Sequence, residues 1–102
     1  MNAPESTMPP LPSGTTTIDG WQDDEGRRYR VIGGQDHRVD GVEGRIGTTA
    51  VQWDDGSIDV TQNDGPTVWL GIGSPEGIRP ATARQLAYAL LAAADEADGW
   101  VA

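Results

Sequence analysis

The last third of the chain carries one long amphipathic pattern, and several short strand-like segments precede it. On a helical wheel of residues 80–97, one arc is apolar and consists of Ala83, Leu86, Ala87, Leu90, Ala93, Ala94 and Ala97. Pro80 suits the first helical position, and Gly99 stands where a helix commonly ends. The pattern predicts an α+β fold in which one C-terminal helix crosses the inner face of an antiparallel sheet.

We expect a sheet of three or four strands, built from consecutive hairpins. The first strand is predicted over residues 26–32, because Arg28 and Arg30 alternate there with Tyr29 and Val31. Residues 42–46 form a weaker strand candidate. The short links between the strand-like segments favour antiparallel pairing over crossover connections.

The first hairpin turns at residues 54–57. A two-residue turn would pair Trp53 with Ile58 and Val51 with Val60, and would place all four side chains on the apolar inner face. A three-residue loop would shift the pairing by one residue and set Asp59 opposite Val51. The clean separation of apolar from polar positions favours the two-residue turn.

A second hairpin is predicted around residues 63–65. A three-residue loop would pair Val60 with Val68 and Ile58 with Leu70, and would turn Trp69 to the outer face of the sheet. A two-residue turn would instead bury Trp69. We prefer the first arrangement, because it buries two aliphatic side chains.

The composition sets the size of the domain and of its core. The chain has 102 residues, so it holds one domain, which we divide into a disordered tail over 1–17 and an α+β domain over 18–102. There is no Phe, and the core must use aliphatic residues and four Trp. Such a thin core leaves room for a homodimer. The absence of Cys excludes disulfides and thiolate metal sites.

The chain offers neither a membrane span nor a secretory signal, so we expect a cytoplasmic protein. Its net charge of −9 disfavours direct binding of nucleic acid, whose phosphates need cations. The same charge suits a basic protein partner, although excess surface carboxylate also serves solubility alone.

No set of residues indicates catalysis, a cofactor or a bound metal. His37 is the one histidine, and its polar loop predicts an exposed and inert side chain. The aspartates near the first hairpin lack the spacing of a calcium loop, and turn formation explains most of them. Ser57 and Ser74 have no paired base. We therefore expect a protein that is not an enzyme.

Two groups of residues are candidates for contact with a partner. Arg28 and Arg30 either pair with the acidic residues 23–25 or form, beside Tyr29, a basic patch for an acidic partner or RNA. Trp69 and Tyr88 are candidate interface anchors. Trp69 could instead be buried under the N-terminal segment with Trp21.

Two stretches of sequence resemble known proteins. Residues 51–60, together with 83–87 and 92–97, resemble small uncharacterised proteins of actinobacteria and their phages, in which a strand with a Trp–acid–Gly turn precedes a helix of the form Ala-Arg-x-Leu-Ala…Ala-Ala-Asp-Glu. The resemblance covers about half of the chain and implies the order of the elements, but no activity. The 51–57 hairpin is also similar to one in SH3-like and Tudor-like barrels.

Three hypotheses of function follow. The first is a non-enzymatic protein-interaction module that binds through the outer sheet face, as a phage-encoded host-factor binder or a virion accessory protein. The second is an acidic nucleic-acid mimic that inhibits a DNA- or RNA-binding protein. The third is a small cation-binding or enzymatic module.

Overall fold

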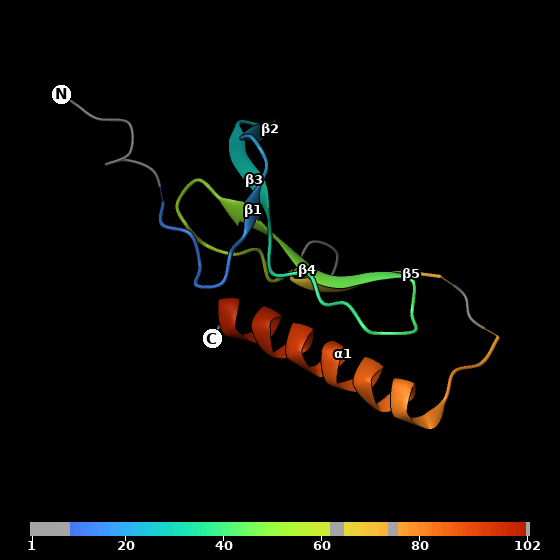
Figure 1. Cartoon of the computed structure of the whole chain (residues 1–102). Helices are drawn as coiled ribbons and strands as arrows, with labels where there is room; N and C mark the ends of the chain where they lie inside the picture. Colours follow the sequence, from blue (N-terminus) through green and yellow to red (C-terminus); the bar gives the residue numbers. More distant parts are fainter. Residues whose placement is uncertain (1–8, 62–64, 74–75, 102) are drawn as a thin grey trace.

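A computed structural model describes residues 9–61, 65–73 and 76–101 of the chain. The described strands are β1 (Thr17–Ile18), β2 (Gln22–Asp24), β3 (Arg27–Gly33), β4 (Gly44–Trp53) and β5 (Thr67–Ile72), and α1 (Pro80–Val101) follows them. Figure 1 shows α1 lying along one side of the sheet. The predicted α+β fold, an antiparallel sheet with one C-terminal helix, is confirmed.

The long strand β4 lies at the centre of the sheet. One edge of its C-terminal half pairs with β3, and the opposite edge of its N-terminal half pairs with β5, both antiparallel. The weak strand candidate at 42–46 and the strand before the first hairpin are therefore parts of one element. The other edge of β3 pairs with β1 and β2.

The strands β1 and β2 were not predicted from the sequence. Both precede β3, and a tight turn at Glu25 and Gly26, which both have positive φ (52° and 85°), joins β2 to β3 as an antiparallel hairpin. Positive φ at both central residues defines the type I′ turn that two-residue hairpins favour. The turn brings Asp23 to 3.8 Å from Arg28, so of the two alternatives for Arg28 the pairing with this acidic segment is the one observed.

The register predicted for the first hairpin is wrong by one residue. The backbone amide of Trp53 donates to the carbonyl of Ser57, and Gln52, not Trp53, bridges to Ile58. The loop therefore has three residues, and its last residue, Gly56, has a φ of 92°. A left-handed residue is what a three-residue hairpin loop requires at that position. Asp55 stabilises the loop by accepting hydrogen bonds from the amide and hydroxyl of Ser57.

The predicted partner of the next strand is also wrong. β5 pairs with β4 and not with residues 58–60, so Val68 lies opposite Thr48 and Leu70 opposite Ile46. Val60 is 71 % exposed. Residues 63 and 64 of the predicted second hairpin lie outside the described residues. Trp69 lies opposite Gly47 and points away from α1, as the preferred arrangement expected.

The shift in register reverses the two faces of β4. The even-numbered residues Thr48, Ala50 and Gln52 face α1, whereas Val51 and Trp53 lie on the opposite face. The hydroxyl of Thr48 donates to the backbone carbonyl of Ala93 on the helix (3.1 Å). Small side chains on both elements allow this close approach, which the larger Val51 and Trp53 would prevent.

The core under α1 is small. Ile32, Ala50 and Trp100 form its buried cluster, and Ile58 packs against them. Ala93 and Ala97 are the other buried residues of the helix, while Ala83 and Ala87, which we expected to face the sheet, are exposed. The helix is therefore buried mainly through its C-terminal half.

A buried polar pair lies beside this core. Arg30 and Gln52 are 3 % and 0 % exposed, and Arg30 Nε donates to Gln52 Oε1 (2.9 Å). Gln52 Nε2 donates to the carbonyl of Pro10, and Arg30 donates to that of Pro9. The ring of Trp21 lies 4.6 Å from the Arg30 guanidinium. The expectation that Arg30 belongs to an exposed basic patch is therefore wrong.

Part of the segment assigned to a tail contacts the folded body. Besides the bonds to Pro9 and Pro10, Trp100 Nε1 donates to the carbonyl of Ser13 (3.0 Å). Trp100 is buried, and α1 begins at Pro80 as predicted but continues through Gly99 to Val101. Burial of Trp100 outweighs the cost of about 1 kcal/mol for a helical Gly.

Among the described residues, no helix is long and apolar enough to cross a membrane.

Candidate functional site

The face of the sheet opposite α1, which we call the outer face, is lined by partly exposed aromatic and aliphatic side chains. The register places these half-buried residues there: Tyr29, Val31, Thr49, Val51, Trp53 and Trp69. No described helix or strand lies over them, because α1 packs on the other side (Figure 1). The outer face therefore keeps apolar surface in contact with solvent.

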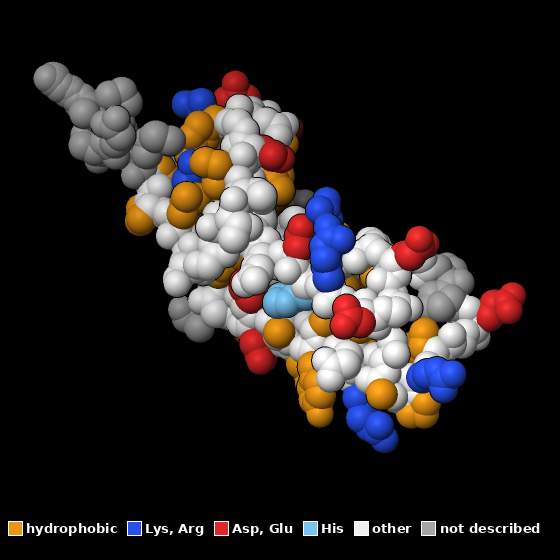
Figure 2. All heavy atoms as spheres, in the orientation of Figure 1, with side chains coloured by type: hydrophobic (Ala, Val, Ile, Leu, Met, Phe, Trp, Pro, Cys, Tyr) orange, Lys and Arg blue, Asp and Glu red, His pale blue; other side chains and the backbone are white. Residues whose placement is uncertain are grey.

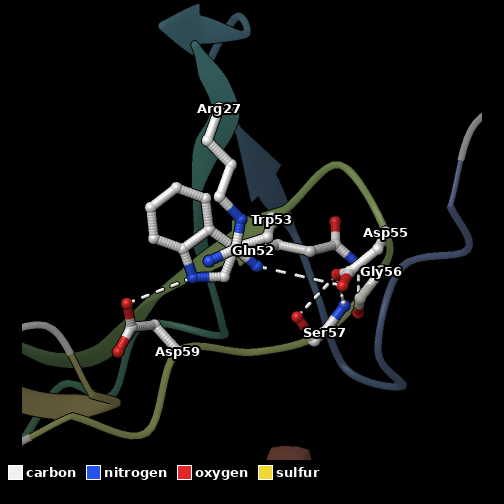
Figure 3. Close-up of polar contacts among 7 residues, drawn as sticks. All are labelled: Arg27, Gln52, Trp53, Asp55, Gly56, Ser57 and Asp59. Atoms are coloured by element: carbon white, nitrogen blue, oxygen red, sulfur yellow. Dashed lines mark hydrogen bonds and ion pairs between the residues drawn. The ribbon is translucent and has the colours of Figure 1, made fainter. Parts of the chain in front are cut away.

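Trp53 organises one end of the outer face. Figure 3 shows Arg27 lying across its indole, with the guanidinium carbon 3.9 Å from the ring centroid. Tyr29 packs edge to face against the same indole, with centroids 5.7 Å apart and planes at 65°. The indole Nε1 donates to Asp59 Oδ2 (3.1 Å). These contacts from three segments fix the orientation of the Trp53 ring.

Two aspartates beside Trp53 are held in their charged form. The backbone amide of Thr61, 2.8 Å from Oδ1, lowers the pKa of Asp59, and the Trp53 indole and the Arg27 charge lower it further. Hydrogen bonds from the hydroxyl and amide of Ser57 lower the pKa of Asp55. Asp55 also lies 3.8 Å from Arg27. Both carboxylates therefore offset the charge of Arg27 at neutral pH.

A surface pocket opens next to this cluster. We call it the aromatic pocket. Its volume is about 280 Å³, and it is lined by Asp23, Asp24, Tyr29, Val51 and Trp53. Arg27 does not line it, so the pocket uses surface of Trp53 that Arg27 leaves free. The pocket combines two aromatic rings with the carboxylate of Asp24, a combination that attracts positive charge, whereas the Asp23 carboxylate pairs with Arg28 on the opposite face.

Trp69 lies towards the other end of the outer face. A Cβ at Gly47 would be only 2.4 Å from Trp69 Cζ2, and one at Gly71 would be 3.0 Å from Cζ3, so the indole rests on these two glycines. Arg45, which pairs with Asp36 at 3.1 Å, lies 6.0 Å from the ring. Gly47 and Trp53 are six residues apart on β4, or about 20 Å. Trp69 is therefore separate from the aromatic pocket.

The structure does not bring the five predicted partner-binding residues together. Tyr29 lines the aromatic pocket, Arg28 pairs with Asp23 behind it, and Trp69 lies towards the far end of the outer face. Tyr88 is 61 % exposed on α1, on the other side of the molecule from the outer face. Arg30 is buried.

The surface charges are interspersed. Figure 2 shows basic and acidic side chains alternating over the visible face, with no broad area of one sign. Arg27, Arg28 and Arg45 each have an aspartate within 4 Å. Of the two alternatives for Arg28 and Arg30, pairing with the acidic residues 23–25 therefore holds for Arg28.

His37 is half-buried, not exposed as we expected. It forms a bridge with Ile46 of β4, and its Nε2 is buried with no hydrogen-bond partner among the described residues. Within ranges 9–61, 65–73 and 76–101, no three His, Asp or Glu side chains gather in a way that could hold a metal ion.

Comparison with known proteins gives no relative from which a role could be transferred: no protein-family model matches the chain, and neither the curated proteins nor the solved structures include a significant match.

Sequence reasoning missed the role of Trp53, Val51 and Asp59 in the outer face. It assigned the first two to the core, because it preferred the two-residue turn. The signal that could have found them is Gly56, which also suits the last position of a three-residue loop. That loop gives the pairing in which Asp59 lies beside Val51 and can reach the Trp53 indole.

Proposed function

We propose that this protein is a non-enzymatic interaction module that binds another protein through the outer face of its sheet. The observation that carries the proposal is the row of half-buried Tyr29, Val51, Trp53 and Trp69 on a face that no described element covers. Tyr and Trp are enriched at protein interfaces, where they contribute large contact areas at a small cost in side-chain entropy.

The ordering of these side chains supports the proposal. Trp53 is fixed by Asp59, Arg27 and Tyr29, and Trp69 rests on a floor of glycine. A partner that docks on rings already held in place loses little conformational entropy on binding. The net charge of −9 would speed association with a basic partner.

The first test is affinity capture by the tagged full-length protein from an actinobacterial lysate, with washes at about 0.1 M and 1 M NaCl. We expect one protein to remain bound at high salt, because apolar contacts are not screened by ions. Loss of every bound protein at high salt, with nucleic-acid-binding proteins in the low-salt fraction, would favour the acidic mimic instead.

A pair of variants locates the surface. Trp69→Ala should abolish capture while Tyr88→Ala, on the exposed side of α1, should preserve it. Melting temperatures of both variants provide the control for folding. If Tyr88→Ala abolishes capture and Trp69→Ala does not, the helix surface is the binding site and the proposal fails. A collapse in the melting temperature of Trp69→Ala would assign Trp69 to the core.

A further inference from the structure

The aromatic pocket is the part of the outer face where the side chains are held in place by the most contacts. Its volume of about 280 Å³ lies just below the range of small-molecule sites, about 300–1,000 Å³. Two rings meet there at an interplanar angle of 65°, because Tyr29 and Trp53 pack edge to face. The size and shape therefore suit a single long side chain better than a cofactor.

The potential inside the pocket is negative. Asp24, which lies on the outer face, forms neither an ion pair nor a side-chain hydrogen bond with any described residue. Aromatic ring faces are themselves negative. Walls of this kind select a cation and repel a phosphate or a carboxylate.

Arg27 opposes the binding of a cation, but its charge is compensated. It lies against Trp53 and faces Asp55 at 3.8 Å, with Asp59 at the edge of the same indole. On the pocket side of the sheet, three carboxylates (Asp24, Asp55, Asp59) outnumber the one guanidinium group, that of Arg27, by two. The local field therefore remains attractive to a positive group.

Two indoles of the molecule already form cation–π contacts with arginine side chains. Arg30 lies over Trp21 and Arg27 over Trp53, at 4.6 and 3.9 Å from the ring centroids. Tyr29 has no such internal cation among the described residues, and its hydroxyl is held by Gln22 Oε1 (3.2 Å). The Tyr29 ring is thus ordered and available at the pocket.

We propose that the aromatic pocket binds a lysine or arginine side chain of the partner protein. The inference rests on the proposed function and specifies the chemistry of the partner: a basic segment whose cationic side chain enters the pocket against the exposed surfaces of Tyr29 and Trp53, with Asp24 as its counter-ion. A cation against an aromatic face is stabilised by the ring quadrupole, most strongly when water is excluded.

The test is a titration of the full-length, ¹⁵N-labelled protein by NMR at constant ionic strength. The probes are three blocked tripeptides with central lysine, arginine or norleucine, raised to about 50 mM, since one side chain supports only millimolar affinity. We expect the lysine or arginine peptide to shift the Trp53 indole signal saturably, with the Trp100 indole unchanged. The neutral norleucine peptide should leave the Trp53 signal in place.

The variant Asp24→Asn should weaken the peptide affinity roughly two- to five-fold, as expected for one exposed charge pair. Asp98→Asn, the same change on an exposed site of α1, should have no effect and controls for net charge. Equal shifts with norleucine, no shift at the highest concentration, or saturable shifts with a short oligothymidylate would each overturn the proposal. If the peptides fail but Trp69→Ala still abolishes capture of a protein, the proposed function stands and only the pocket assignment is lost.

Discussion

Replacing Gln52 by Leu gives the sharpest test of which face of β4 is buried. Gln52 is fully buried, accepts a hydrogen bond from Arg30 Nε and donates to the carbonyls of Pro10 and Gly56 (2.9 and 3.3 Å). Leu is of similar size, so the change removes the hydrogen bonds without opening a large cavity. It leaves a charged donor and two carbonyls unpaired in a buried site.

The expected loss is about 3 kcal/mol in the free energy of unfolding. A hydrogen bond to a charged group contributes about 1.5–3 kcal/mol, and a buried carbonyl left unpaired costs about 1 kcal/mol more. For a domain of this size, 3 kcal/mol corresponds to a fall of roughly 12–24 °C in the melting temperature. Few single polar substitutions on a protein surface have effects of that size.

Circular dichroism with heating and with urea measures this loss, and Gln85→Leu is the matched control. Gln85 is exposed on α1, so the same substitution there should change stability by less than about 0.5 kcal/mol. If Gln52→Leu behaves like Gln85→Leu, the Gln52 side chain is in solvent. That result would refute the three-residue loop and restore the register with the two-residue turn.

Two further predictions concern the outer face. Gly47→Ala would place a Cβ at 2.4 Å from the Trp69 ring, so it should lower the free energy of unfolding by about 1–3 kcal/mol and change the tryptophan fluorescence. The control Gly20→Ala, with no atom within 4 Å of the new Cβ, should leave the stability unchanged. Equal stabilities of the two variants would mean that the ring does not rest on Gly47. Hydrogen bonds from Thr61 lower the pKa of Asp59 in the folded state, so its contribution to stability is present above the unfolded pKa of about 3.9 and disappears as pH falls through the lower folded value. Asp59→Asn should therefore flatten the acid side of the stability–pH curve, and an unchanged curve would contradict this.

Local patterns predicted several elements of the fold. The period of two in residues 26–32 located β3, and the apolar arc with Pro80 located the start of α1. Both signals lie within one element and do not depend on what packs against it. The outward direction of Trp69 was predicted correctly, although its strand pairs with β4 and not with residues 58–60.

The register of β4 could not be predicted from the same patterns. Either of its two sets of alternating side chains could face the core. Ala50 and Thr48 are small enough to be buried, and Val51 and Trp53 are apolar enough to be buried. The choice depends on α1, which needs small residues beneath it, and on Gln52, whose partners come from distant segments. Long-range contacts, not local propensity, decide which face is the core.

The aromatic pocket could not be predicted from the sequence either, because it too depends on long-range contacts. Its residues come from β2, β3 and β4, and Trp53 was expected to lie in the core. The sequence of β2 shows no strand pattern, because all three of its residues are polar and exposed. Only the turn at Glu25–Gly26 places this short segment beside β3. The contribution of Asp23 and Asp24 to a site became visible only through the pairing of the strands.

The most direct measurement of the central claim is the affinity of the captured partner for two matched charge variants. Val51→Arg places a guanidinium group in the middle of the outer face, and Leu91→Arg places one on the exposed side of α1, where Leu91 is 60 % exposed. Titration calorimetry with both folded variants should show binding lost with Val51→Arg, because the new charge repels a basic partner, and nearly unchanged with Leu91→Arg. Unchanged binding with Val51→Arg, or loss only with Leu91→Arg, would contradict a binding surface on the outer face.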